Sequence, residues 1–268
     1  MKNNIYTSII FIFFFLITSI HANEQFDFDI TEMEITEEGN IVKGYKKGIA
    51  TTDNGLKIEA ENFIYNKMLN ILDAKGDVKI TDTINDYVIF AEKITYIKDQ
   101  EKIFTSGDTI AIIESRFNFE SKNVLFQKDI MNLSSSEKSL LKDKDLNLYK
   151  FDKFNYSITE SLLKGINIEI VTNYKKPKNE SDFLFFDDGI FNLKKNNFVT
   201  GKTKIKIKKN IFDISKNDPR IYGVSSSKND EITTINKATF TSCALNDKCP
   251  PWSISSNKIL HDTKKKQI

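Results

Sequence analysis

The segment KIEAENFIY (57–65) recurs three more times in altered form, as YVIFAEKITY (87–96), FNFESKNVLF (117–126) and LYKFDKFNYSI (148–158). Ala60, Ala91, Ser121 and Phe151 occupy one aligned position, at spacings of 31, 30 and 30 residues. Self-similarity at a fixed period of this size indicates a repeat architecture, in which neighbouring units bury one another's apolar faces. Within each unit the apolar residues alternate with polar ones, and a period of two predicts β-strands.

Each unit has a second half, as in NILDAKGDVKI (70–80) and KIFTSGDTIAI (102–112), where Gly76 and Gly107 mark a turn or bulge. The alternation slips by one residue between Ala60 and Phe63, and the slip recurs in every unit. A β-bulge or corner at that point would return both residues to the same interior side. The repeat therefore predicts an all-β fold, an elongated antiparallel β-jelly-roll or solenoid of two-strand units about thirty residues long.

The apolar residues that the alternation places on the inward face are predicted to form the inner wall of this fold. They are Ile58, Ala60, Phe63, Tyr65, Leu72, Val78, Ile80, Ile89, Ile94, Tyr96, Ile103, Phe119, Val124, Phe126, Leu133, Tyr149, Phe154, Tyr156 and Leu163. A plain hydrophobic core is one interpretation of this wall. A slot that admits an apolar chain is the other, and the sequence leaves both open.

The N-terminal segment and the overall charge restrict the functional class. Lys2, an apolar run from Ile9 to Ile17 and Ala22 predict a signal peptide over 1–22, because the run is shorter than the roughly 20 residues of a membrane span. An uncleaved anchor is the alternative. Either way the mature chain is predicted to enter an oxidising, exported compartment. The net charge of +2 and the absence of a basic block before 264–266 argue against nucleic-acid binding.

The residue types needed for catalysis are scarce. His21 lies in the predicted signal peptide and His261 is alone, so neither a histidine-based triad nor a zinc cluster is expected. No cofactor motif is found. Glu59 and Glu61 could serve a secreted hydrolase, but a solvated strand face explains them more simply.

The stretch FTSCALNDKCPPWSISSNKILHD (240–262) holds both cysteines, Cys243 and Cys249, and the only tryptophan, Trp252. Together with the export signal and the repeat, it resembles the LptD family of lipopolysaccharide-assembly proteins. The repeat also resembles the jelly-roll shared by LptA and LptC. The resemblance implies a signal peptide (1–22), an OstA-like β-jelly-roll (23–214) and a connector (215–268) toward an outer-membrane barrel that this sequence lacks.

The resemblance also implies a function and partners. Lipopolysaccharide would cross the periplasm with its acyl chains in the apolar slot, on the way to the Gram-negative outer membrane. An LptA-type bridge protein would dock by β-augmentation on an edge formed by Phe28, Ile30, Met33 and Ile35. A separate barrel chain with its LptE-type lipoprotein plug would be the downstream partner.

The cysteines depart from the family pattern. Cys243 matches a cysteine that pairs with the barrel in the family, and the family's early cysteine is absent from 23–242. A Cys243–Cys249 disulfide is the pairing predicted within this chain, and free thiols are the alternative.

Three other functions remain open from the sequence: a soluble LptA-type lipid carrier, a structural β-solenoid with a filled core, and the secreted hydrolase. The chain is also expected to be a fragment, half of a split gene or a short protein in its own right.

Overall fold

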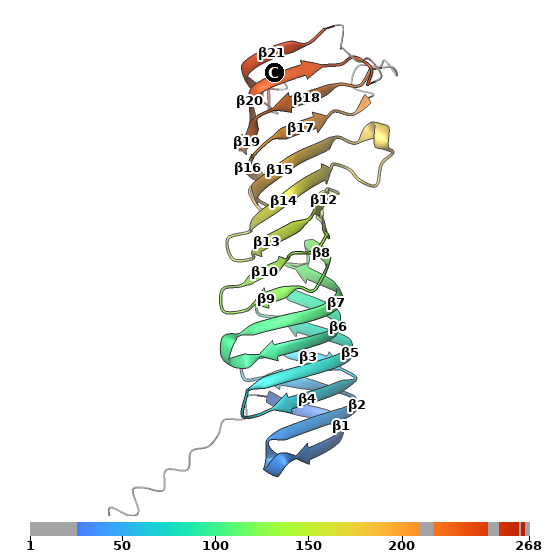
Figure 1. The fold of residues 1–268 in the computed structure, drawn as a ribbon, viewed down its shortest axis with the longest axis vertical. Coiled ribbons are helices and arrows are strands. Elements are labelled where there is room, and N and C mark those ends of the chain that lie inside the picture. The colour runs from blue at the N-terminus through green and yellow to red at the C-terminus, as the bar shows by residue number, and fades with distance from the viewer. Residues whose placement is uncertain (1–25, 210–216, 246–251, 263, 266–268) are drawn as a thin grey trace, which may run out of the picture.

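A computed structural model describes residues 26–209, 217–245, 252–262 and 264–265. The predicted signal peptide and Cys249 lie outside these residues. The described residues form one antiparallel sheet of 21 strands, which stack into an elongated molecule with short 3-10 turns (Figure 1). The strands are β1 (Phe26–Thr36), β2 (Ile41–Thr52), β3 (Lys57–Ala60), β4 (Asn62–Asn66), β5 (Ile71–Asp82), β6 (Tyr87–Ile97), β7 (Lys102–Ile113), β8 (Phe117–Lys122), β9 (Leu125–Gln127), β10 (Asn132–Ser135), β11 (Ser139–Lys142), β12 (Leu148–Phe151), β13 (Lys153–Ser157), β14 (Leu162–Val171), β15 (Phe183–Asn192), β16 (Asn197–Thr200), β17 (Thr203–Lys206), β18 (Arg220–Gly223), β19 (Ser225–Asn229), β20 (Ile232–Thr241) and β21 (Ile254–Asp262). The turns are η1 (Glu37–Gly39), η2 (Lys98–Gln100) and η3 (Lys178–Glu180). The predicted all-β antiparallel class is confirmed.

The sheet is folded lengthwise into two facing layers. Half-sheet 1 contains β4, β9, β10, β13, β16 and β19, and half-sheet 2 contains β3, β8, β11, β12, β17 and β18. The long strands β1, β2, β5, β6, β7, β14, β15, β20 and β21 pass through both layers. For example, one end of β5 pairs with β4 and the other end pairs with β3.

The corner between the two layers lies where the sequence predicted a phase slip. β3 ends at Ala60 and β4 begins at Asn62, so that Ala60 and Phe63 are both buried. The β5–β6 register shifts between Lys75 and Val78, across Gly76, whose φ is +85°. A left-handed backbone at this point suits glycine, because it has no Cβ to clash with the main chain.

The interior between the layers is apolar and follows the cross-strand register. One continuous row in half-sheet 1 reads Ile35, Val42, Tyr65, Leu72, Tyr96, Ile103, Phe126, Leu133, Tyr156, Leu163, Phe191 and Phe198. From Val42 to Phe191 this row belongs to one core that extends from Phe26 to Leu193. A smaller core around Ile221, Ile235 and Ala238 follows it along the stack.

The sheet continues beyond residue 215, where the sequence suggested a boundary. β17 pairs with β18, which pairs in turn with β20. Between the two cores, the hydroxyls of Thr200, Thr203 and Ser226 are buried and bonded to one another, with Thr200 Oγ1 2.6 Å from Ser226 Oγ. The change in sequence pattern near residue 215 thus corresponds to a change in the composition of the core. Among the described strands, the hydrogen-bonded sheet continues on both sides of it. The roles of jelly-roll and connector stay predictions.

Candidate functional site

The positions predicted to line a slot all lie in the interior, and each is at most 9 % exposed. They are Ile58, Ala60, Phe63, Tyr65, Leu72, Ile80, Ile89, Ile94, Tyr96, Ile103, Phe119, Val124, Phe126, Tyr149, Phe154 and Tyr156. Their rings interlock: Phe119 stacks on Phe154 with centroids 5.2 Å apart and lies 5.0 Å from Tyr156. The interior here is therefore a packed core, and a lipid chain could enter only if the layers moved apart. Lipid contact at these residues stays a prediction.

The layers are joined by backbone along the corner alone. On the opposite long side, which we call the seam, the turns of half-sheet 1 face those of half-sheet 2. Side chains close it: Phe117 of half-sheet 2 lies 6.1 Å from Tyr156 of half-sheet 1, and Lys194 Nζ lies 2.7 Å from Glu114 Oε1. Within the described parts of the chain, no main-chain hydrogen bond crosses the seam. The corner could therefore act as a hinge between the two layers, and the seam is the side that could open.

Tyrosine hydroxyls reach polar partners on the seam side. The hydroxyl of Tyr96 donates a hydrogen bond of 2.5 Å to Glu101, whose carboxylate also binds Lys98 and lies 3.4 Å from Lys128. Burial raises the pKa of Tyr96, and the bond to Glu101 raises it further. Burial alone would raise the pKa of Glu101, but hydrogen bonds from Lys98 and Tyr96 and the lysine charges outweigh it, so this pKa is lowered. At Tyr96 the apolar interior is thus bordered by a charged, hydrogen-bonded cluster.

The predicted docking edge, on β1, divides into two parts. Phe28 and Ile30 pack against the core, and Ile30 fills the space left by the missing side chain of Gly44. Met33 and Ile35 oppose Gly44 and Val42 on β2, so they point to the interior face, because directly opposed residues share a face. They are nevertheless 48 % and 58 % exposed, since no strand of half-sheet 2 covers them. The apolar interior is therefore open at this end.

The other end of the stack is also unpaired. Among the described strands, β21 pairs with β20 alone, and Ile254 on β21 is 60 % exposed. Cys243 is buried, with Sγ 3.6 Å from the carbonyl oxygen of Trp252, and has no disulfide partner among the described residues. Because Cys249 lies outside those residues, the predicted Cys243–Cys249 disulfide stays a prediction. Sequence reasoning missed Arg220, whose guanidinium donates to the carbonyl oxygen of Cys243 and fixes this segment.

The two residues considered for catalysis, Glu59 and Glu61, line one hollow together with Lys79 and Gly76. Glu59 forms an ion pair of 3.6 Å with Lys79 on the outer face of half-sheet 2. Glu61 lies at the corner, beside Gly76. Within the described ranges, no group of three or more metal-binding side chains comes together, and no helix has the length and apolarity to span a membrane.

No protein-family model matches the sequence, and a search of curated proteins finds no match. Among solved structures, the chain is similar to LptH from Pseudomonas aeruginosa, described as the LptA-homologous periplasmic component of the lipopolysaccharide transport device. The match covers 42 % of this chain and 82 % of that one, with 11 % sequence identity and a TM-score of 0.37. The function proposed below does not depend on this likeness.

Proposed function

We propose that this protein is a periplasmic section of a bridge that carries lipopolysaccharide to the outer membrane, with the acyl chains between the two half-sheets. One observation carries the proposal: the apolar interior is continuous from Phe26 to Leu193, and only side-chain contacts close it along the seam. Such an interior can take up an apolar chain through its seam, while the hydrophilic part of the same molecule stays in water. Burial of each methylene contributes roughly 0.8 kcal/mol, so several acyl chains need a long apolar lining to cross an aqueous space.

The open N-terminal end supports a bridge assembled from several proteins. Among the described strands, none covers Met33 and Ile35 on the interior face, and β1 pairs with β2 alone. An LptA-type protein that added its own strand to β1 would cover both residues and extend the apolar interior across the junction. β1 carries four acidic residues and no basic one. Glu32 and Glu34 form ion pairs with β2, so Asp27 and Asp29 are the carboxylates that favour a basic edge on that partner.

The C-terminal stretch is our reason for preferring one of two versions of this function. We propose that the chain is the front of an LptD-type assembly, because Cys243, Trp252 and Ile254 resemble in sequence the family's connector to the barrel. The barrel and its LptE-type plug would then be downstream partners. A soluble LptA-type carrier has no need of such a connector.

A structural β-solenoid is the second candidate, and the packing of the interior favours it. Phe119, Phe126 and Tyr156 are each at most 1 % exposed, so the central interior has no room for a chain in this conformation. The two candidates differ in one property, which is whether the seam opens.

Locking the seam tests the difference. Glu114→Cys and Lys194→Cys would be combined with Cys243→Ser and Cys249→Ser, and the pair joined with a short bis-maleimide across the seam. Fluorescent lipopolysaccharide is then offered to the locked protein, the unlinked protein and each single-cysteine form. The bridge proposal predicts that only the locked form fails to bind. Equal binding by all forms would place the lipid elsewhere, and no binding by any form would favour the filled solenoid.

A further inference from the structure

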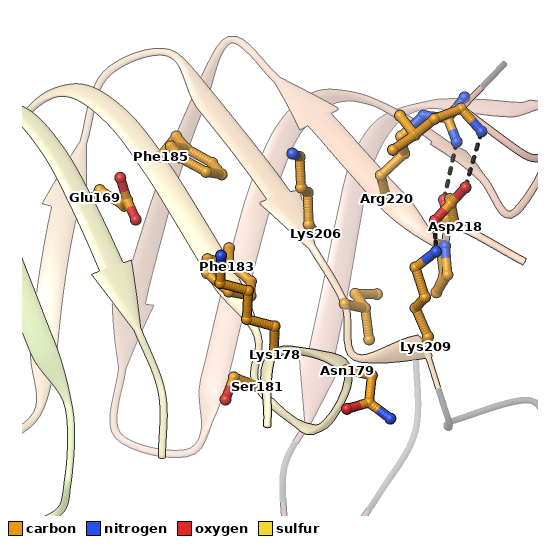
Figure 2. A pocket seen from close by; sticks show the side chains of 13 residues that line it. Glu169, Lys178, Asn179, Ser181, Phe183, Phe185, Lys206, Lys209, Asp218 and Arg220 are labelled. Carbon is orange, nitrogen blue, oxygen red and sulfur yellow. Dashed lines mark hydrogen bonds and ion pairs between the residues drawn. The ribbon is translucent and has the colours of Figure 1, made fainter. Parts of the chain in front are cut away.

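A groove of about 520 Å³ lies on the outer face of half-sheet 2, away from the interior. Leu184 and Phe186 on β15 point into the core, so their neighbours Phe183 and Phe185 point outward. Figure 2 shows these two rings on the groove floor, with Lys178 and Lys206 beside them and Arg220 toward one end. We call this site the outer groove and define it by Phe183, Phe185, Ile207, Lys178, Lys206 and Arg220. Its volume falls within the range of about 300–1,000 Å³ typical of small-molecule sites.

Cross-strand register brings the cations and rings together. Phe183 opposes Lys206, which opposes Arg220 on the next strand, and Phe185 opposes Lys204. The ammonium groups of Lys206 and Lys204 lie 5.5 and 5.9 Å from the centre of the Phe185 ring. The lysines are therefore held over an aromatic surface by attraction to the ring. Apolar and cationic groups alternate across neighbouring strands.

The carboxylates of the groove are already neutralised. Asp218 lies 2.6 Å from Lys209, and Glu169 lies 2.9 Å from Lys150, which is outside the groove. Burial alone would raise the pKa of Asp218, but hydrogen bonds from Lys209 and the Leu245 amide outweigh it and lower this pKa, so the carboxylate stays ionised and bound.

Lys178 and Lys206 are not compensated by any described carboxylate, whereas Arg220 interacts with Asp218 and helps to lower the pKa of that carboxyl group. Among the residues that the structure describes, no carboxylate lies within ion-pair distance of Lys178, Lys206 or Arg220. The groove therefore has an excess of positive charge that an anion can balance.

Hydrogen bonds fix both walls of the groove. In the wall that carries Lys178, the amide of Lys208 donates to Asp182 at 2.8 Å, and Ser181 Oγ donates to the Asn173 carbonyl at 3.3 Å. In the opposite wall, Arg220 donates to the Asp218 carbonyl at 2.9 Å, and the amide of Leu245 donates to the Asp218 carboxylate at 2.9 Å. A site held in this way loses little conformational entropy when a ligand binds.

We propose that the outer groove binds the phosphate-bearing headgroup of an anionic amphiphile. The phosphate is placed between Lys206, Arg220 and Lys178, and the first carbons of the chain lie against Phe183, Phe185 and Ile207. Lysine and arginine are the side chains that bind phosphate, and the rings supply the apolar contact that a free phosphate cannot use. This site is separate from the interior, so it can exist whether or not the seam opens, and its failure would leave the bridge proposal untouched.

Calorimetric titration with dodecyl phosphate, below its micelle concentration, tests the site. The comparison ligands are dodecylphosphocholine, which has no net charge, butyl phosphate, which has a short chain, and inorganic phosphate. Dodecyl phosphate is expected to bind most tightly. In Lys178→Gln/Lys206→Gln its affinity is expected to fall about tenfold or more, because two charge-assisted contacts are lost.

Matched variants distinguish the loss of the two lysine contacts from a general change in net charge. Lys164→Gln/Lys195→Gln removes the same two charges at exposed positions outside the groove and is expected to leave the affinity within about twofold, because distant exposed charges are screened. Phe185→Gln is expected to reduce the preference for dodecyl over butyl phosphate. Arg220 is left intact, because it also binds the Cys243 carbonyl. Circular dichroism checks that each variant is folded.

Five results would overturn the proposal. Four are equal affinity for dodecylphosphocholine, affinity for inorganic phosphate as high as for dodecyl phosphate, no loss in a folded Lys178→Gln/Lys206→Gln variant, and equal losses in the two lysine pairs. The fifth is the absence of a heat of binding at two temperatures, since the enthalpy of apolar binding can be near zero at one of them.

Discussion

Replacement of Phe119 by alanine measures whether the interior is packed or loose. The ring is 1 % exposed, stacks on Phe154 at 5.2 Å and contacts Tyr156 at 5.0 Å. Loss of a fully buried apolar side chain costs about 1.5–3 kcal/mol in transfer free energy. The two ring contacts add about 0.5–1.5 kcal/mol each. The expected loss is therefore about 3–5 kcal/mol in the free energy of unfolding, the usual range for Phe→Ala in a close-packed core.

Urea denaturation followed by circular dichroism measures this loss, with Phe104→Ala as the control. Phe104 points outward from half-sheet 1 and is 39 % exposed, so its removal is expected to cost under about 1 kcal/mol. Because stacked repeats can unfold in parts, hydrogen exchange at the amides of β8 and β13 is measured on the same samples. If Phe119→Ala costs no more than Phe104→Ala, the interior is not packed, and the argument for a closed core between the half-sheets is wrong.

Three other changes have definite expected outcomes. Gly76→Ala should lower the melting temperature, because φ is +85° there and a Cβ would lie 2.6 Å from the Glu61 carboxylate; an unchanged melt would contradict the corner geometry. The pKa of Glu101 is lowered in the folded state. Its contribution to the free energy of unfolding is therefore fully present above the unfolded pKa of about 4.3 and is lost as the pH falls through the folded pKa. Glu101→Gln should therefore flatten the stability curve in acid, and an unchanged curve would refute this role. Ile35→Asp should leave stability almost unchanged, because the side chain is exposed, but should abolish capture by an immobilised LptA-type protein; retained capture would exclude this edge.

The repeat in the sequence was sufficient to predict the corner and the inner wall. The slip between Ala60 and Phe63 is a local signal, because the backbone must turn wherever alternation changes phase while both residues stay buried. Gly76 and Gly107 added a second local signal, and both have positive φ. Fold class and inward-facing positions could thus be deduced from short stretches of chain.

The packing of the interior had no such local signal. Whether Phe119 and Phe154 meet depends on the distance between two layers, and that distance is set by side chains from different units. The division of β1 into a covered part and an open part likewise depends on which strand of half-sheet 2 faces each strand of half-sheet 1. Contacts of this kind are tertiary, so a pattern along one strand does not reveal them.

The outer groove was missed for a different reason. Residues 183–186 read FLFF, a run without polar alternation, so the sequence could not say which rings point outward. Residues 225–227 read SSS, a run with weak strand propensity, yet they belong to β19 because pairing with β16 and β20 holds them in the sheet. Tertiary pairing overrides weak strand propensity at such positions.

Photocrosslinking to lipopolysaccharide tests the central claim most directly. Benzoylphenylalanine is placed at Met33 and Phe126 on the interior face, and at Ile64 on the outer face, in cells that make lipopolysaccharide. Met33 on β1 and Ile64 on β4 are a matched pair, 48 % and 49 % exposed on opposite faces of one half-sheet, in which β2 lies between the two strands. The account predicts adducts at Met33 and Phe126 and none at Ile64. Adducts at Ile64 equal to those at Met33, or none at either interior position, would contradict an interior path for the lipid.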